Sequence, residues 1–303
     1  MSSPIGGLPS RLHFHLTPEV LERFPGTKVA LLVLEIPVLS KKGQPKEMQN
    51  FLSELKQRSV RQIVDFGITP DNYLETRVCR SWVEVFRTFQ AGPEKQSTIV
   101  NLLRRAATEG NKIREGKKAD MGTISNFVDY YNCQSLQTMT PMGATDIRKI
   151  AQRDQEATVS LRLAREGESF IPLGKDETPV PLTPTSVVYA DEEKILTGFW
   201  NYRDARECCV PNESAKTETG EPQKEFILLV ADQAERDGEA SSLPIAERPG
   251  DVEEAILRSS QDLHRIGGHW YAYDVLSRER PAITIDFTNI LEGTVAVTPP
   301  CGN

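Results

Sequence analysis

Three short segments between residues 126 and 204 combine polar and aromatic side chains with apolar residues of the kind that proteins bury. They read N-F-V-D-Y-Y-N-C-Q-S-L at 126–136, V-V-Y-A-D-E at 187–192 and F-W-N-Y-R-D at 199–204. Buried polar groups must find partners, so such clusters usually line a pocket, here where neighbouring apolar strands end. The candidate substrate-binding side chains are Asp129, Tyr131, Asp191, Trp200, Arg203 and Asp204.

Two amides and two nucleophiles are the candidates for catalysis. The amides of Asn132 and Asn201 suit the polarisation of a carbonyl, although asparagine also serves simply to stabilise turns. Cys133 and Ser135 are candidate nucleophiles, and the alternative for Cys133 is a buried, inert thiol. If this segment is a strand, Cys133 and Ser135 share one face and Asn132 lies on the other. They then cannot all line one pocket unless the strand ends or bulges there.

Cysteine and histidine usage narrows the chemistry. The five cysteines are odd in number and show no C-x-x-C spacing, which predicts neither a disulfide framework nor a zinc site. The four histidines lie outside the three segments, so a Cys-His or Ser-His pair has little support. We expect no metal and no redox cofactor. The N-terminus lacks the pattern of a signal peptide, and no apolar run approaches the roughly 18–20 residues of a membrane span, so we expect a cytoplasmic protein without membrane contact.

The charge is unevenly spread along the chain. Net charge is −7, but residues 41–118 carry 16 Lys and Arg against 9 Asp and Glu, while the remainder carries 20 against 34. A basic portion on an acidic protein can meet phosphate and keep non-specific binding low. The alternative is a solvated helical surface. The candidate phosphate contacts are Lys41, Lys42, Arg104, Arg105, Lys117 and Lys118.

Hydrophobic periodicity predicts an α+β fold with helices on one side of a mostly antiparallel sheet. We expect a flexible tail over 1–12, a single domain over 13–303, and long acidic loops at 211–223 and 234–250. Helices are predicted at 17–24, 47–66, 81–90, 97–110, 144–152 and from the Asp251 capping box to about 265. Strands are predicted at 28–37, 158–164, 186–190, 194–200, 226–231, 281–287 and 294–298.

Several motifs in this order resemble the editing domain of the phenylalanyl-tRNA synthetase β subunit and its free-standing relatives. R-S-W-V-E-V-F-R-T-F at 80–89 is similar to the family's tryptophan-containing helix, and F-V-D-Y-Y-N-C-Q-S-L to its Val-Asp-x-Tyr-Asn element. M-T-P-M-G-A-T-D-I at 139–147 resembles its Pro-x-Gly turn, and the two segments at 187–192 and 199–204 resemble its paired late strands. The likeness extends from about residue 15 to 267. The acidic 211–250 segment and residues 268–303 depart from the compact bacterial relatives.

The resemblance implies a pocket for aminoacyl-tRNA without the modules that charge tRNA. Some fungal relatives are arginine-containing cyclodipeptide synthases, and the long loops here look more like those proteins. This implies arginyl-tRNA as substrate, a second amino acid, and arginyl-tRNA synthetase as supplier. The alternatives are a free-standing editing hydrolase and a non-catalytic tRNA-binding module, and fold alone does not decide among them.

An arginine substrate would place a demand on the acidic residues of the three segments. A guanidinium needs a carboxylate that can accept two parallel hydrogen bonds, and the candidates are Asp129, Asp191, Glu192 and Asp204. Each acid also has a structural alternative. Asp129 can cap a helix or pair with Arg203, and Asp191 can belong to a solvated hairpin turn.

Overall fold

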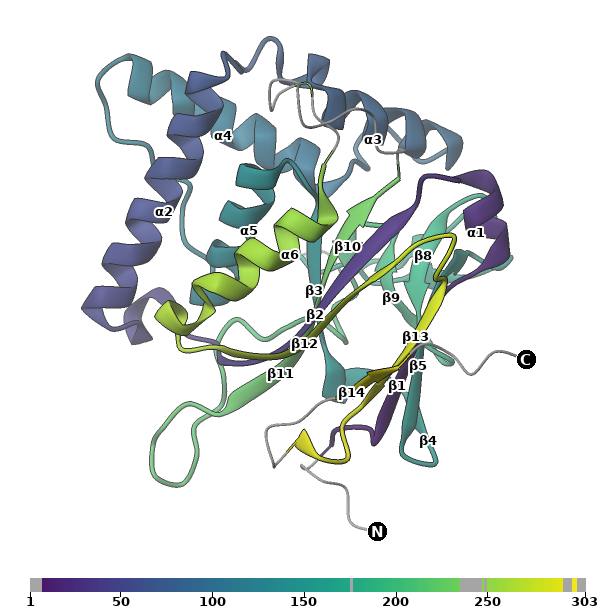
Figure 1. Ribbon diagram of the computed structural model, residues 1–303. Helices are drawn as coiled ribbons and strands as arrows, with labels where there is room; N and C mark the ends of the chain where they lie inside the picture. The colour runs from purple at the N-terminus through teal and green to yellow at the C-terminus, as the bar shows by residue number, and fades with distance from the viewer. Residues whose placement is uncertain (1–6, 175–176, 235–246, 248–249, 291–295, 299–303) are drawn as a thin grey trace.

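The computed structural model describes residues 7–174, 177–234, 247, 250–290 and 296–298 of the chain. In these residues two main sheets lie beside a group of helices (Figure 1). The larger sheet has the order β10 (Arg203–Asp204), β9 (Ile195–Gly198), β8 (Val187–Ala190), β5 (Glu156–Leu163), β1 (Arg11–Leu16), β13 (Ala282–Asp286) and β14 (Ala296–Thr298), with β4 (Gln152–Arg153) on β5. The smaller sheet has the order β12 (His269–Leu276), β2 (Lys28–Pro37), β11 (Lys224–Gln233) and β3 (Met142–Asp146). A short hairpin joins β6 (Ser169–Phe170) and β7 (Val180–Pro181).

Pairing in these sheets is antiparallel except between β1 and β5, within the part of the chain that the structure describes. The α+β class predicted from periodicity is therefore confirmed. The helices are α1 (Pro18–Arg23), α2 (Lys46–Asp65), α3 (Arg77–Thr88), α4 (Thr98–Arg114), α5 (Asn126–Thr138) and α6 (Val252–Gln261).

Strand β2 is the centre of the molecule and has the bounds that its sequence predicts. Leu32 and Leu34 pack on one side with α2, α5 and α6, whereas Leu31 and Val33 pack on the other side with the larger sheet, α3 and α4. A strand buried on both faces needs a continuous apolar run rather than an alternating one. This explains why K-V-A-L-L-V-L-E-I-P is recognisable as a strand in the sequence.

Two helix ends show how the sequence signals work. Asp251 caps α6 as predicted, because its Oδ1 accepts a hydrogen bond from the N–H of Glu254 at 3.0 Å. The sequence predicts that α4 ends at Gly110, but the helix continues to Arg114. A Cβ at Gly110 would lie 2.9 Å from the Val64 side chain of α2. This glycine therefore permits two helices to pack closely and does not end the helix.

Two predictions of local structure are wrong. The helix predicted at 144–152 is absent, because these residues begin inside β3 and continue through a 3-10 turn at Ile147–Lys149. Pairing with β11 over residues 142–146 decides this, since tertiary contacts override weak local propensity. Strand alternation does not apply after Ser125, because that segment is α5, with the Ser125 hydroxyl accepting from the N–H of Val128 at 3.2 Å.

The predicted flexible tail over residues 1–12 is too long, because part of it belongs to the fold. Leu8 and Leu12 are buried, and β1 starts at Arg11. At the other acidic segments, residues 211–223 form irregular structure with one bridge between Lys216 and Pro222. Most of the predicted 234–250 loop lies outside the described residues. The mobility of both segments stays a prediction.

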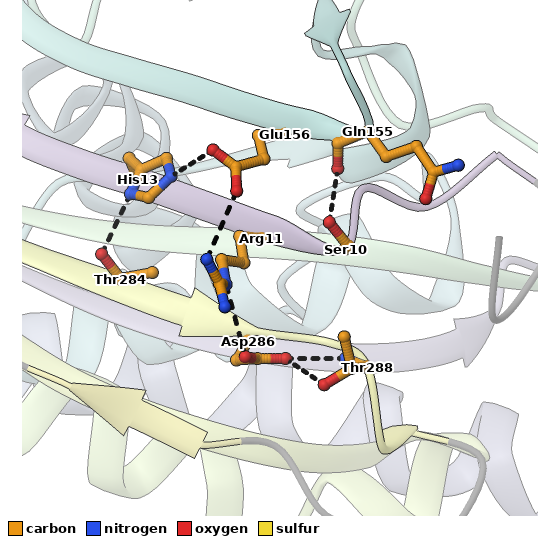
Figure 2. A network of polar contacts seen from close by, with 8 residues as sticks. All are labelled: Ser10, Arg11, His13, Gln155, Glu156, Thr284, Asp286 and Thr288. Atoms are coloured by element: carbon orange, nitrogen blue, oxygen red, sulfur yellow. Dashed lines mark hydrogen bonds and ion pairs between the residues drawn. The ribbon is translucent and has the colours of Figure 1, made fainter. Parts of the chain in front are cut away.

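A polar network crosses three strands of the larger sheet (Figure 2). His13 on β1 contacts Thr284 on β13 through Nδ1 at 3.0 Å and Glu156 on β5 through Nε2 at 3.2 Å. Arg11 lies 3.5 Å from both Glu156 and Asp286. The register explains the cluster, because His13 is paired with Thr284 and Arg11 with Asp286 and Glu156. Exposed pairs of this kind stabilise a sheet by less than about 1 kcal/mol each.

Candidate functional site

A cavity of about 550 Å³ opens where α4 and α5 meet both sheets. Helix α5 contributes Val128, Tyr131 and Asn132, which share one helix face because they are spaced by three and four residues. Helix α4 contributes Thr98 and Asn101 from its first turns, and its arginines reach the rim. Strands β3, β8, β9, β10 and β11 complete the wall.

Four of the six predicted substrate-binding residues and both predicted catalytic amides line this cavity. The first predicted segment contributes Tyr131 and Asn132, and the third contributes Trp200, Asn201, Arg203 and Asp204. The segments meet because α5 packs beside β3, and β3 lies next to β10. The functional roles of these residues stay predictions.

The two predicted nucleophiles lie elsewhere. Cys133 faces the packed interior between α5, α2 and the smaller sheet, and burial raises the pKa of its thiol to about 12. The Ser135 hydroxyl is buried and donates a hydrogen bond to the carbonyl of Thr140. Neither side chain lines the main cavity. The geometry therefore gives no support to either one as a nucleophile, because the Cys133 thiol is buried in the packing with α2 and the Ser135 hydroxyl is bonded to Thr140.

Asp191 is a turn residue. Its carboxylate accepts hydrogen bonds from the backbone N–H groups of Ala151, Glu193 and Lys194, each at 2.8 Å. These three bonds hold the β8–β9 connection and leave the side chain outside the main cavity. The expectation that Asp191 would converge with Asn132 and Asn201 is therefore wrong. Its structural alternative, a hairpin turn, describes what the residue does.

Asp129 is held in an ion pair outside the main cavity. Its Oδ2 lies 2.7 Å from Nζ of Lys56 on α2, and its Oδ1 accepts from the N–H of Ile124 at 3.0 Å. Burial raises the pKa of Asp129, and the Lys56 ammonium opposes that rise. The cationic partner of Asp129 is thus Lys56 and not Arg203. One helical turn separates Asp129 from Asn132, which does reach the cavity.

A strained turn presents Asn201 to the cavity. Phe199 and Trp200 follow β9 with φ of 48° and 63°, which places two consecutive non-glycine residues in the left-handed region. Such conformations persist only where surrounding packing fixes them, and they cluster at functional sites. Trp200 is fully buried and packs edge-on against Phe24 and Trp82, with ring centroids 5.3 and 5.2 Å away. This packing holds the turn in place.

The most buried carboxyl of the site, Asp232 at the end of β11, is absent from the sequence-based candidates. Its side chain accepts hydrogen bonds from the Tyr189 hydroxyl, from Nε1 of Trp200 at 3.2 Å and from Nδ2 of Asn201 at 3.4 Å. Burial raises the pKa of Asp232 to about 7. In the sequence it is one acidic residue after an apolar strand, which signals only that the strand ends. Tyr189, within the second segment, is likewise not among the candidates.

Asp204 is the second carboxyl on the cavity wall. It lies on β10, half-buried, and accepts a hydrogen bond from the Thr197 hydroxyl at 2.9 Å. Burial raises the pKa of Asp204 to about 6. Two carboxyls with raised pKa values in one cavity are a feature that functional sites share, because a desolvated acid is more stable beside a cationic ligand.

The rim of the cavity is basic and partly apolar. Arg104, Arg105 and Arg203 are exposed there, and the Arg203 guanidinium lies over the Tyr202 ring, 5.2 Å from its centroid. Leu173 is 42% exposed at the same edge. Cationic groups and stackable surfaces around a mouth are suited to a phosphate-bearing, base-bearing ligand.

A second, polar cavity of about 420 Å³ lies beside the first. It is lined by Lys41, Lys56 and Lys118 among other residues, and by Met121. Met121 accepts a hydrogen bond through its carbonyl from Arg105, which lines the main cavity, so the two hollows are neighbours. Of the other predicted phosphate contacts, Lys42 is exposed, and Lys117 is exposed but lies 2.7 Å from Glu115.

Residues 97–217 match the family model of the B3/4 domain, the domain type found in the phenylalanyl-tRNA synthetase β subunit. The matched segment carries α4, α5 and nearly all of the cavity wall, apart from Glu94, Val230 and Asp232. This match supports the interpretation that the protein is a relative of that editing and tRNA-binding domain. It also supports a tRNA-related binding or editing role. A comparison with curated proteins found no match.

Two further findings concern the described residues only. None of their helices is long and apolar enough to cross a membrane. No group of three or more His, Cys, Asp or Glu side chains among them is arranged to hold a metal ion.

Proposed function

We propose that the cavity receives the aminoacylated end of a tRNA and that the protein joins two aminoacyl groups into an arginine-containing diketopiperazine. One observation carries this proposal. The same cavity has carboxyls inside, Asp204 and Asp232, and arginines at its rim, Arg104, Arg105 and Arg203. An aminoacyl ester at the end of a nucleic acid has the complementary order of charge, with a cationic amino acid ahead of its phosphates.

Asp204 is the carboxylate that we assign to the arginine side chain. A guanidinium binds a carboxylate best through two parallel N–H···O bonds, which needs a carboxylate with a free edge. Asp191 lacks one because three backbone N–H groups occupy it, and Asp129 is occupied by Lys56. Asp204 is half-buried and accepts from the Thr197 hydroxyl and the backbone N–H of Ala144, one donor fewer than the three backbone N–H groups at Asp191.

The reaction needs two ester aminolyses and no redox step. In each, an amine nitrogen attacks the ester carbonyl carbon of the other aminoacyl group, a C–N bond forms, and the C–O bond to the ribose breaks. Each α-ammonium gives up two protons, one to solvent before the neutral amine attacks and one to the leaving ribose oxygen. Because both carbonyls must be activated, the second amino acid also arrives as an ester. Arginyl-tRNA synthetase supplies the arginyl ester.

Both predicted catalytic amides lie on the cavity wall, but Nδ2 of Asn201 already donates to Asp232, so the amide of Asn132 is the one that we assign to the ester. Amide N–H groups directed at a carbonyl oxygen stabilise the charge that develops as the amine attacks. The positions of Cys133 and Ser135 outside the cavity favour direct aminolysis over an aminoacyl-enzyme intermediate. The contribution of this chain is then to bind, orient and polarise two esters that are already reactive.

The tRNA body would follow the basic side of the helices. Arg104 and Arg105 stand at the rim of the main cavity, and Lys41 and Lys118 line the second cavity next to it. This path lets the acceptor end enter while the adjoining phosphates meet lysines. Lys117 contributes less, because Glu115 already pairs with it.

A free-standing editing hydrolase is the second candidate, and the exposed rim favours it. Water can reach the ester through a mouth formed by exposed residues such as Arg104 and Leu173. In that case water would replace the amine as nucleophile, and a free amino acid would leave. The same cavity and the same arginines would serve both reactions.

One assay separates these functions. The purified protein is incubated with tRNA, ATP, arginyl-tRNA synthetase, arginine, and a mixture of the other synthetases and labelled amino acids. An arginine-containing diketopiperazine detected by mass spectrometry supports the proposal. Release of free amino acid above the spontaneous rate, with no dipeptide, supports the hydrolase. Binding of tRNA with no turnover of any charged form would make the protein a tRNA-binding module and overturn both.

A further inference from the structure

We propose that Asp232, Asn201 and Thr98 form the subsite for the α-ammonium group of the aminoacyl ester, an assignment that rests on the function proposed above. The three side chains come from β11, from the left-handed turn after β9 and from the first turn of α4, and all three line the main cavity. Each supplies an oxygen that can accept a hydrogen bond.

Three side-chain donors fix the Asp232 carboxyl and leave it with capacity for one more hydrogen bond. Tyr189 and Trp200 donate to its Oδ1, and Asn201 donates to its Oδ2 at 3.4 Å. Its backbone N–H also donates to the carbonyl of Pro141, which anchors the end of β11. An ionised carboxylate has about four acceptor positions, so three donors leave capacity for one more. A carboxylate held this firmly is preorganised for a small cation.

Asn201 points to the kind of ligand that fits. The residue is 4% exposed, and its Oδ1 has no hydrogen-bond partner among the described residues. The bond from Nδ2 to Asp232 sets the orientation of the amide and leaves Oδ1 as the unpaired atom. An amide oxygen can only accept, so the missing partner must be a donor. A buried acceptor without a partner destabilises the free protein, and a donor on a ligand would remove that cost.

Thr98 contributes the third oxygen. Its Oγ1 is likewise buried with no partner among the described residues, and its backbone N–H donates to the backbone carbonyl of Asn201 at 3.0 Å. The two unpaired oxygens therefore belong to residues that are already in direct contact. An ammonium has three N–H donors and no acceptor, which matches one carboxylate and two neutral oxygens.

The same geometry argues against a guanidinium at this position. Asp232 is 1% exposed and Trp200 is fully buried, so the space beside them is enclosed. Both oxygens of Asp232 already accept bonds, so it has no free edge for a bidentate pair. Asp204, which is half-buried, keeps that role. The raised pKa of Asp232 agrees with a carboxyl whose ionised form a bound cation would stabilise, since a neighbouring positive charge would lower this pKa again.

The test compares binding of three tRNA probes in which a stable amide replaces the ester, so that neither hydrolysis nor transfer intervenes. The probes carry arginine, N-acetylarginine or leucine at the 3′ end. For the wild-type protein we expect arginyl-tRNA to bind more tightly than N-acetylarginyl-tRNA by about tenfold or more, since hydrogen bonds to charged groups are strong. Asp232→Asn should bring that ratio close to one. Asp204→Asn should keep it and instead reduce the preference for arginine over leucine.

Asp191→Asn is the matched control, because it neutralises a buried carboxylate outside the cavity and should change neither ratio. Thr98→Val preserves shape and should lower the ammonium ratio by several-fold, so it serves as the test if Asp232→Asn fails to fold. A wild-type ratio retained in Asp232→Asn, or in Thr98→Val when that variant is the test, overturns the subsite. If the wild-type protein binds no aminoacyl probe better than uncharged tRNA, the proposed function fails and the subsite fails with it.

Discussion

Nε1 of Trp200 donates a hydrogen bond to Oδ1 of Asp232 at 3.2 Å, across 32 positions of sequence. The bond joins the turn after β9 of the larger sheet to the end of β11 in the smaller sheet. It therefore couples the strained backbone at Trp200, with φ of 63°, to the most buried carboxyl of the cavity. The position of the Asp232 carboxyl in the cavity therefore depends on how the two sheets pack together.

The pH dependence of stability should reveal Asp232. Burial raises its pKa in the folded protein to about 7 from the ordinary value of 3.8. Between these two values the unfolded chain has lost the proton that the folded chain keeps, so stability falls as pH rises from about 4 to 7 and is level above. Asp232→Asn removes this dependence. Urea unfolding at several pH values measures this. The free energy of unfolding of the variant, relative to that of the wild type, should rise by a few kcal/mol from about pH 4 to pH 7, since each pKa unit is about 1.4 kcal/mol. A pH-independent difference between the two would contradict the assignment.

The pair between Lys56 and Asp129 should matter for stability. Lys56→Met leaves a buried carboxylate without its cation, and losing one partner of such a pair costs about 3–5 kcal/mol, less here because Lys56 retains some exposure. Chemical denaturation measures the loss. Lys117→Met, which removes an exposed ion pair with Glu115, is the control and should cost less than about 1 kcal/mol. Similar small effects in both variants would show that the buried pair is dispensable.

Asn132→Ala should separate function from folding. The side chain is half-buried on the cavity wall and its helix remains intact in the variant, since alanine favours helix. If the amide polarises the ester carbonyl, kcat should fall by about 10²–10³ with the free energy of unfolding changed by less than about 1 kcal/mol. Steady-state kinetics with aminoacyl-tRNA and thermal melts together decide the point. Unchanged kcat would remove Asn132 from the catalytic set.

Charge reversal at the rim should weaken tRNA binding in a salt-dependent way. Arg104→Glu and Arg105→Glu should each lower the slope of log affinity against log salt by somewhat under about one for every phosphate that the variant no longer neutralises. Titrations of tRNA at several salt concentrations give the slope. Arg153→Glu, at an exposed position on β4 outside both cavities, is the control. Slopes that match the wild type in both rim variants would exclude the α4 arginines from the interface.

Substrate choice should depend on Asp204. Asp204→Asn should penalise arginyl substrates relative to neutral ones by about tenfold or more in kcat/KM, because a desolvated guanidinium would lose its charged partner. Competition between arginyl-tRNA and leucyl-tRNA in one reaction measures the ratio directly. An equal loss for both substrates would make Asp204 a structural residue, bonded to Thr197, and would leave the arginine preference without a carboxylate.

The sequence by itself determined the elements whose signals are local or continuous. The apolar run at 28–37 predicts β2 because a strand buried on both faces has no polar side to interrupt it. Asp251 predicts the start of α6 because a cap acts within one turn. The segments at 126–136 and 199–204 are recognisable as candidate parts of a site, because they place polar side chains among apolar residues that a protein buries. Four of the six predicted substrate-binding side chains and both predicted catalytic amides do lie on one cavity wall.

Only the tertiary structure decided which polar groups face that cavity. Residues 144–146 are strand because β11 lies beside them. Tyr131 and Asn132 line the same cavity because α5 places neighbours about 100° apart, whereas strand alternation would put them on opposite faces. Asp191 closes a turn partly through the local N–H groups of Glu193 and Lys194, which is why the sequence offers a turn as its alternative. Asp232 has no such local signal, because its donors Tyr189, Trp200 and Asn201 lie 43, 32 and 31 positions away and reach it only when the two sheets pack together.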